Sequence, residues 1–197
     1  MTDVTSFITA GGRSSRMGRD KAWLDVGGRA MIEHVIAALE PVTQRVAIIA
    51  NSSNYARLGF PVYADTNSGI GPLEAIRTAL ANAVTSQVIL VGCDLPFVTS
   101  ELFKLLLRLS GNYHATVPVS SDGRLEPLCG VYRVEALPVV SELIACGGRK
   151  VSVLFDRVPT RLVAFAELSH LPNSHRFFEN INTPEDYLRI GGRLSIG

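Results

Sequence analysis

The sequence has few cysteines and no excess of charge of either sign. Its three cysteines, Cys93, Cys129 and Cys146, lie far apart and form no CxxC pair, which argues against a disulfide framework or a structural zinc site. A reducing, cytoplasmic compartment is therefore expected. The formal net charge is +1, so neither nucleic acid nor an acidic membrane surface is expected as a partner.

Long apolar runs are also missing. No run approaches the roughly 20 residues of a membrane helix, and Met1–Val4 lacks the basic segment and apolar run of a secretion signal. Apolar residues make up 47% of the chain and charged residues 19%, as in a globular protein with a substantial core. The length of 197 residues favours one α/β domain spanning 1–197.

In the first half, short β-branched segments alternate with segments of helical periodicity. Strands are expected at Val4–Ala10, Arg45–Ala50, Val62–Ala64 and Val88–Gly92, and helices at Ala30–Glu40, from Pro72 onward and at Glu101–Leu109. This order predicts βαβ units on a mostly parallel sheet with helices on both faces. Ligands bind beyond the carboxyl ends of such strands. We therefore expect the loop after Ala10, Asp65 and Asp94 to share one edge of the sheet.

The second half is less regular. A smaller hairpin region is predicted, with strands at Ala115–Val119 and Leu125–Tyr132 around a turn at Ser120–Gly123. A helix is expected at Glu135–Ala145 and a late strand at Arg161–Ala166. Thr183, Pro184 and the two following acids have the pattern of a helix N-terminus.

The most informative segment is the loop after the first strand, Thr9–Lys21. Gly11 and Gly12 let the backbone approach a ligand and direct N–H groups at phosphate oxygens. Arg13, Arg16, Arg19 and Lys21 add positive charge within nine residues. The alternative is a basic surface loop with turn glycines, but the position after a strand favours phosphate binding. Neither GxxxxGK[ST] nor GxGxxG is present.

The second feature is Asp94, which follows the strand Val88–Gly92. A carboxylate facing a triphosphate is suited to Mg²⁺, which needs few protein oxygens. The alternative is an Asp that begins a turn before Pro96. Cys93 has no assignable base, so it is interpreted as a buried small residue rather than a nucleophile.

Several further polar positions have two open interpretations each. Gly71, Pro72 and Leu73 begin a helix, and the glycine backbone is also a candidate contact for a base or ribose. Asp65 either caps locally or contacts ribose or metal, and Asn51 either reads a base or closes a turn.

The candidates for binding a second substrate lie late in the chain. Asn180 and Asn182 lie on the same side of a short extended segment, so both either reach the site or satisfy local backbone. Arg149 and Lys150 are candidates to hold a second anionic substrate, or form a solvated basic pair.

These motifs resemble those of the MobA-type nucleotidyltransferases. The run Ala10–Lys21 is similar to the family signature AGGxSxRMGxDK. Four further segments follow in the family's order and approximate spacing over nearly the whole chain: Gly71-Pro72-Leu73, Cys93-Asp94-Leu95-Pro96, Glu126-Pro127-Leu128 and Asn180–Asp186. Two positions depart from the pattern, since Thr9 replaces a usual Leu and Glu74-Ala75 stands where small residues are common.

The resemblance implies a Rossmann-like nucleotidyltransferase fold that uses Mg²⁺ and transfers GMP from GTP to molybdopterin. Residues 1–110 would then bind the nucleotide and residues 111–197 the molybdopterin. Asp94 would be the magnesium ligand, with Arg16 and Lys21 neutralising charge during transfer. The family's nucleotide contacts would fall on Thr9, Ala10, Gly11, Lys21, Asn51, Asp65 and Asp94.

Three other functions stay open at this point. Relatives that use CTP tend to have Ala-Ala-Gly where this chain has Ala10-Gly11-Gly12, which favours GTP over a cytidylyltransferase. A transferase acting on a sugar or alditol phosphate would share the glycine loop, but the run Asn180–Asp186 favours molybdopterin. A non-catalytic nucleotide-binding module would not need both Lys21 and Asp94. A molybdoenzyme or chaperone is a possible acceptor of the product.

Overall fold

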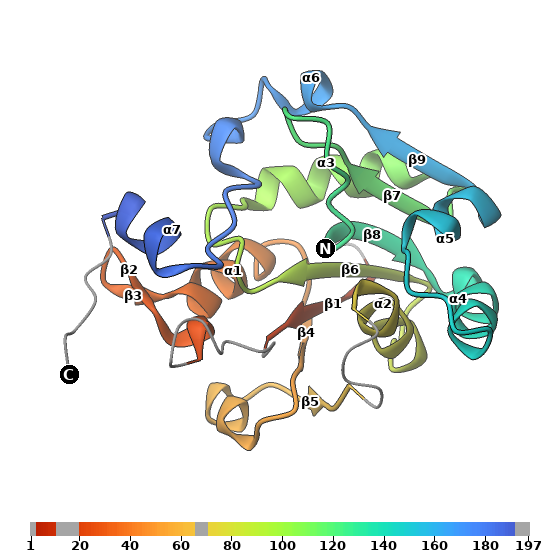
Figure 1. The fold of residues 1–197 in the computed structure, drawn as a ribbon, viewed down its shortest axis with the longest axis horizontal. Coiled ribbons are helices and arrows are strands. Elements are labelled where there is room, and N and C mark those ends of the chain that lie inside the picture. Colours follow the sequence, from red (N-terminus) through yellow and green to blue (C-terminus); the bar gives the residue numbers. More distant parts are fainter. Residues whose placement is uncertain (1–2, 11–19, 66–70, 192–197) are drawn as a thin grey trace.

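The computed structural model describes residues 3–10, 20–65 and 71–191. Seven strands form one sheet in the order β5-β4-β1-β6-β8-β7-β9 (Figure 1). Strand β8 runs antiparallel to both of its neighbours, and the other pairs are parallel. The strands are β1 (Val4–Thr9), β4 (Arg45–Ile49), β5 (Val62–Tyr63), β6 (Gln87–Gly92), β7 (Ala115–Pro118), β8 (Cys129–Arg133) and β9 (Thr160–Val163).

Helices cover both faces of this sheet. The α-helices are α1 (Met31–Leu39), α2 (Pro72–Ala81), α3 (Ser100–Ser110), α4 (Leu137–Ala145), α5 (Ser152–Arg157), α6 (Phe165–Leu168) and α7 (Pro184–Arg189). The 3-10 helices are η2 (Lys21–Trp23), η3 (Ser53–Leu58), η4 (Val134–Ala136) and η5 (Ser174–Arg176). Among the described residues, no helix is long and apolar enough to cross a membrane.

The two faces are separated by the alternation of side chains along each strand. In β1, Ile8 packs with residues of α1 and α3, whereas its neighbour Phe7 packs with residues of α2 and α4. Both side chains are fully buried. The apolar strands predicted from the sequence are therefore covered on both faces, as a parallel sheet requires.

A small third cluster joins two distant segments at the edge where β6 ends. The hairpin of β2 (Asp25–Val26) and β3 (Arg29–Ala30) lies beside α7 (Figure 1). Val26 and Tyr187 are both buried there, and the Tyr187 hydroxyl donates to the Asp25 carbonyl at 2.6 Å. This hairpin, which the sequence analysis did not predict, positions the last helix near the carboxyl ends of the strands.

The expected strands and helices of the first half are confirmed to within a residue or two. In the second half, β8 begins at Cys129 rather than Leu125, because Cys129 N donates to the Glu126 carbonyl at 3.0 Å and turns the backbone there. The predicted strand Arg161–Ala166 was too long. It ends at Val163, because Ala164 is the N-cap of α6 and its N–H donates to the Glu167 carboxylate. Helix α5 was not predicted.

Candidate active site at the carboxyl edge of the sheet

The carboxyl ends of the central strands meet at one edge. Thr9 pairs in register with Ile49 of β4 and with Gly92 of β6, so these three strands end together. Ala10 N donates to the Ile49 carbonyl, and Cys93 N donates to the Thr9 carbonyl, each at 2.9 Å. The segments that follow therefore start side by side, as the sequence analysis predicted.

Three side chains from distant parts of the chain meet at this edge. Lys21 Nζ lies 2.9 Å from Asp94 Oδ2 and donates to Asn182 Oδ1 at 2.7 Å. The Lys21 and Asp94 side chains are 17% and 22% exposed, so water reaches the pair but does not surround it. A cation, a carboxylate and an amide oxygen thus share one partly covered position.

A short helical turn presents Lys21. Asp20 caps η2 by accepting from Ala22 N at 3.2 Å, and it also accepts from the buried Tyr55 hydroxyl at 2.6 Å. The Tyr55 ring stacks on Trp23, and burial raises the pKa of Tyr55 far above its ordinary value. Asp20 and Tyr55 were not identified from the sequence, because their contact joins two segments that have no shared motif.

The Asp94 carboxylate lies directly over a glycine. A Cβ atom at Gly92 would overlap Asp94 Oδ1. The Asp94 carbonyl accepts from Ile181 N at 3.1 Å, which holds the segment carrying Asn182 against the loop. Asn182 N and Thr183 N both donate to Asp186, so the cap of α7 fixes the same segment from its other side. The predicted Thr183 cap is confirmed.

The candidates for binding the nucleoside lie along the other side of this edge. Asn51 is exposed just after β4. Asp65 accepts from the Thr78 hydroxyl at 3.3 Å, and burial raises its pKa above the ordinary value. Gly71 has φ of 84° and precedes Pro72, the first residue of α2. Leu73 is fully buried in the core, which leaves only its backbone for a ligand. Gly11, Gly12 and Arg16 lie outside the described residues.

The candidates for the second substrate are only partly brought together. Asn182 reaches Lys21, whereas the Asn180 side chain makes no hydrogen bond within the described part of the chain. Arg149 and Lys150 lie exposed in the turn between α4 and α5. Within the described ranges no hydrogen bond or ion pair links either of them to Lys21 or Asp94.

Glu126 is a buried carboxylate on the turn before β8. Its residue is 8% exposed, and Oε1 has no hydrogen-bond partner among the described residues. Burial raises the pKa of Glu126 to about 7; the positive charge of Arg124 opposes the rise, and the negative charges of Asp122 and Asp94 add to it. The sequence analysis noted Glu126 only as part of a motif and gave it no role.

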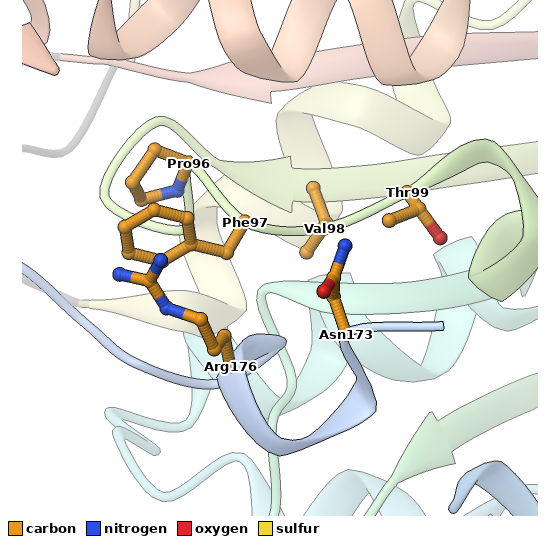
Figure 2. A pocket seen from close by; sticks show the side chains of 6 residues that line it. All are labelled: Pro96, Phe97, Val98, Thr99, Asn173 and Arg176. Carbon is orange, nitrogen blue, oxygen red and sulfur yellow. The ribbon is translucent and has the colours of Figure 1, made fainter. Parts of the chain in front are cut away.

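A hollow of about 260 Å³ lies just beyond this site. It is lined by Pro96, Phe97, Val98, Thr99, Asn173 and Arg176. Figure 2 shows Phe97 and Arg176 together at one end, where the guanidinium lies 3.5 Å from the ring centroid. None of the residues expected to bind the nucleotide lines this hollow. The hollow is therefore a neighbour of the site and not part of it.

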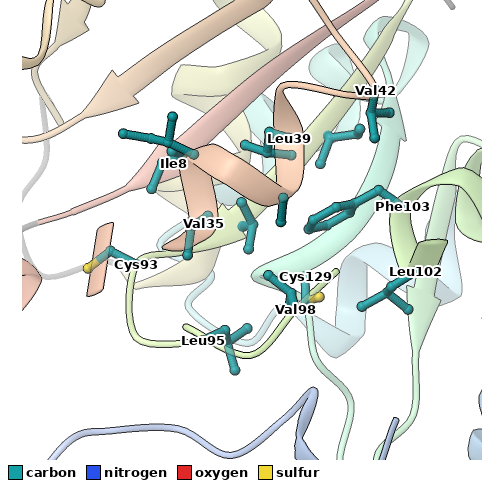
Figure 3. Packing of buried hydrophobic residues seen from close by; sticks show 14 of the residues in the cluster. Ile8, Val35, Leu39, Val42, Cys93, Leu95, Val98, Leu102, Phe103 and Cys129 are labelled. Carbon is teal, nitrogen blue, oxygen red and sulfur yellow. The ribbon is translucent and has the colours of Figure 1, made fainter. Parts of the chain in front are cut away.

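The cysteines near the site are part of the core. Figure 3 shows Cys93 and Cys129 packed among apolar side chains such as Val35 and Leu95. They are 2% and 0% exposed, and burial raises the pKa of the Cys129 thiol well above its ordinary value. Cys93 is thus a buried residue, as predicted. In the described part of the chain, no three His, Cys, Asp or Glu side chains cluster as a metal site.

Comparison with known proteins identifies the chain as a nucleotidyltransferase. Residues 6–160 match the MobA-like NTP transferase domain, which is more than half of the chain. The chain belongs to the MobA-like NTP transferase family. Membership in this family agrees with the resemblance of its glycine loop and Asp94 motif.

Two relatives within this family align over almost their whole length. The chain is 36% identical over 190 residues to the probable molybdenum cofactor guanylyltransferase of Carboxydothermus hydrogenoformans, covering 96% of each protein. It is 31% identical over 197 residues to the molybdenum cofactor guanylyltransferase of Shewanella sp. (strain MR-4), covering 98% of this chain and 97% of that one.

Solved structures of other proteins have the same fold. Molybdopterin-guanine dinucleotide biosynthesis protein A from Archaeoglobus fulgidus superposes with a TM-score of 0.79 at 24% identity, covering 94% of this chain and 96% of that one. A Mycobacterium tuberculosis H37Rv protein, solved in complex with manganese, superposes with a TM-score of 0.67 at 18% identity, covering 96% and 98%. The predicted Rossmann-like nucleotidyltransferase fold is confirmed.

Proposed function

We propose that this chain transfers GMP from GTP to the terminal phosphate of molybdopterin, releasing pyrophosphate and forming the guanine dinucleotide form of the molybdenum cofactor. The observation that carries the proposal is the contact of Lys21 Nζ with Asp94 Oδ2 at 2.9 Å, beyond the ends of β1 and β6. A cation beside a carboxylate can serve both a triphosphate and its divalent ion. Similarity to guanylyltransferases over the full chain supports GMP as the transferred group.

The chemistry needs little from the protein beyond positioning. An oxygen of the acceptor phosphate attacks the α-phosphorus of GTP, and pyrophosphate leaves from the opposite side. A phosphate monoester has a second pKa of about 6, so the attacking group is already largely ionised at neutral pH. A general base is therefore unnecessary, and catalysis consists of alignment and charge stabilisation.

The residues around Asp94 suit Mg²⁺, which prefers oxygen ligands and takes only one or two carboxylates from a protein. Asp94 offers a carboxylate and Asn182 an amide oxygen, and Lys21 contacts both. We assign Asp94 as the magnesium ligand. A bound ion would neutralise negative charge on the triphosphate.

Positive charge from the protein completes the site. Lys21, held by η2, is assigned to the phosphates of GTP, and Arg16 and the N–H groups of Gly11 and Gly12 are assigned to the departing pyrophosphate. These groups stabilise charge that develops as the bond to the leaving group breaks. Lys21 reaches Asp94 and Asn182 in the described structure, which supports its central role.

The acceptor is assigned to the side of Asp94 formed by the second half of the chain. Asn182 lies at Asp94 and Asn180 is two residues away, so this segment is the first candidate to contact molybdopterin. Arg149 and Lys150 are proposed to attract its anionic groups. A molybdoenzyme or chaperone would then take up the product.

Calorimetric titration of GTP, CTP and ATP with Mg²⁺ tests the nucleotide. GTP is expected to bind most tightly, and Asp94→Ala is expected to weaken that binding. A preference for CTP would instead support the second candidate, a molybdopterin cytidylyltransferase of the same fold. Failure of all three nucleotides to bind would contradict both candidates.

A further inference from the structure

The carboxylate of Glu126 is placed so that it needs a partner. Its backbone is already fixed, because Glu126 N donates to the Pro118 carbonyl and the Glu126 carbonyl accepts from Cys129 N, each at 3.0 Å. The side chain is nonetheless buried, and Oε1 is shielded from solvent with no hydrogen bond among the described residues. A buried carboxylate oxygen without a partner is unfavourable unless a ligand supplies one.

Pairing between the ends of β6 and β8 brings the segments that carry Asp94 and Glu126 near each other. Val91 of β6 pairs with Cys129 of β8, and Gly92 N donates to the Leu128 carbonyl at 2.8 Å. Asp94 lies two residues after Gly92, and Glu126 lies two residues before Leu128. The two carboxylates therefore stand on neighbouring segments at the same end of β6 and β8. The negative charge of Asp94 also contributes to the raised pKa of Glu126, which agrees with their proximity.

The two oxygens of Asp94 have different surroundings. Oδ2 accepts from Lys21, on the side of the nucleotide candidates. Oδ1 lies over Gly92, where an added Cβ would also come within 3.8 Å of the Leu128 carbonyl. The position that Oδ1 occupies over Gly92 is thus close to the turn that begins at Glu126.

The groups near Glu126 leave a surplus of negative charge. Arg124 Nη2 is 3.9 Å from Glu126 Oε1, too far for a hydrogen bond, and its side chain is 59% exposed. Asp94 and Asp122 add two further carboxylates, and the Asp122 carboxylate is occupied by Ser120 and Arg124. Lys21 pairs with Asp94, so among these groups Glu126 is the carboxylate that has no close cation. A divalent cation shared with Asp94 would supply one.

We propose that Glu126 is the second protein carboxylate of the divalent-cation site organised by Asp94. The inference rests on the proposed function, which places Mg²⁺ at Asp94. Mg²⁺ sites that use substrate phosphates and water for most ligands need only one or two carboxylates. Glu126 stands on the side of the sheet assigned to molybdopterin, so the two carboxylates bind the ion from both halves of the chain.

Binding of Mn²⁺ alone, followed by electron paramagnetic resonance, tests this assignment without depending on turnover. Glu126→Gln is expected to weaken Mn²⁺ binding at least about tenfold, the scale for disturbing a metal site. Asp122→Asn is the matched control, because it removes the same charge from the same turn at an exposed position. It is expected to leave Mn²⁺ affinity within about twofold.

Two further variants keep the result interpretable. Glu126→Asp retains the charge with a shorter side chain and is expected to bind Mn²⁺ with intermediate affinity, whether or not the Gln variant folds. Asp94→Asn should lose Mn²⁺ binding. Wild-type affinity in both Glu126 variants, with loss in Asp94→Asn, would overturn the role of Glu126 and leave the proposed function standing.

Other outcomes also decide between the two proposals. An Asp94→Asn variant that binds Mn²⁺ like the wild type would contradict the metal assignment of the proposed function itself. A Glu126→Gln variant with unchanged Mn²⁺ binding and a raised KM for molybdopterin would make Glu126 an acceptor contact, and would overturn the inference. So would a wild-type chain that binds no Mn²⁺.

Discussion

At the scale of single residues, the site depends on how each atom of Asp94 is used. Oδ2 meets Lys21, Oδ1 lies over Gly92, and the carbonyl accepts from Ile181. These partners come from three separate parts of the chain. The orientation of the carboxylate is therefore set by tertiary contacts as well as by the end of β6.

Replacing Lys21 with Ala should reduce kcat/KM at least about 10²-fold, the scale for losing one preorganised electrostatic donor. The fold should persist, because Lys21 is at the edge of the site and partly exposed. Lys104→Ala on the exposed side of α3 is the control and should leave kcat/KM unchanged. Steady-state kinetics measure both; equal activity of the two variants would show that Lys21 has no special role.

Replacing Gly92 with Ala should lower activity with little loss of stability. The new methyl group would occupy the position of Asp94 Oδ1, and the short Asp94 side chain can rotate away. The carboxylate would then no longer be presented as it is in the wild type. Thermal melting and calorimetric Mg²⁺–GTP binding measure the two effects. A variant with normal binding would mean that the orientation of Asp94 is unimportant.

Glu126 makes stability depend on pH. Burial raises its pKa from the ordinary 4.5 to about 7. Between these values the folded chain keeps a proton that the unfolded chain has lost, so the free energy of unfolding falls as pH rises through this window. The total loss is on the order of 3 kcal/mol. Urea unfolding without divalent ions should show this decline in the wild type. A comparable decline in Glu126→Gln would contradict the assignment.

At the scale of elements, short turns rather than long helices hold the reactive groups. Lys21 belongs to the single turn η2, and Asn182 precedes the short helix α7. The β2–β3 hairpin and α7 pack together through Val26 and Tyr187. The three-residue and two-residue elements here carry too little periodicity to be predicted, so the sequence analysis missed η2 and the hairpin.

Replacing Tyr55 with Phe tests whether the hydrogen bond from Tyr55 to Asp20 holds η2 in position. The buried hydroxyl donates to Asp20 at 2.6 Å, and its loss should cost about 1–3 kcal/mol of unfolding free energy, the scale for a hydrogen bond to a charged group. Because Asp20 caps the turn that carries Lys21, kcat/KM should also fall several-fold. Tyr113→Phe, at an exposed position, is the control. Unchanged stability and kinetics in Tyr55→Phe would show that Tyr55 does not support η2.

At the scale of the whole molecule, both halves of the chain build one sheet and one site. That the loop after Ala10, Asp65 and Asp94 would follow strands ending at one edge was predictable, because parallel strands end on the same side. The contact of Lys21 with Asn182 was not, because no local pattern reports a contact across 161 positions. The position of Glu126 near this edge could not be predicted from the sequence either. The hairpin of β7 and β8 was predicted, but not that β8 would pair with β6.

The most direct test of the central claim is to identify the product. Purified chain is incubated with Mg²⁺, molybdopterin and an equal mixture of GTP and CTP, and the products are separated and identified by mass spectrometry. The account predicts the guanine dinucleotide of molybdopterin together with pyrophosphate, and neither product with Asp94→Ala. A cytosine dinucleotide, or the guanine product formed undiminished by Asp94→Ala, would contradict it.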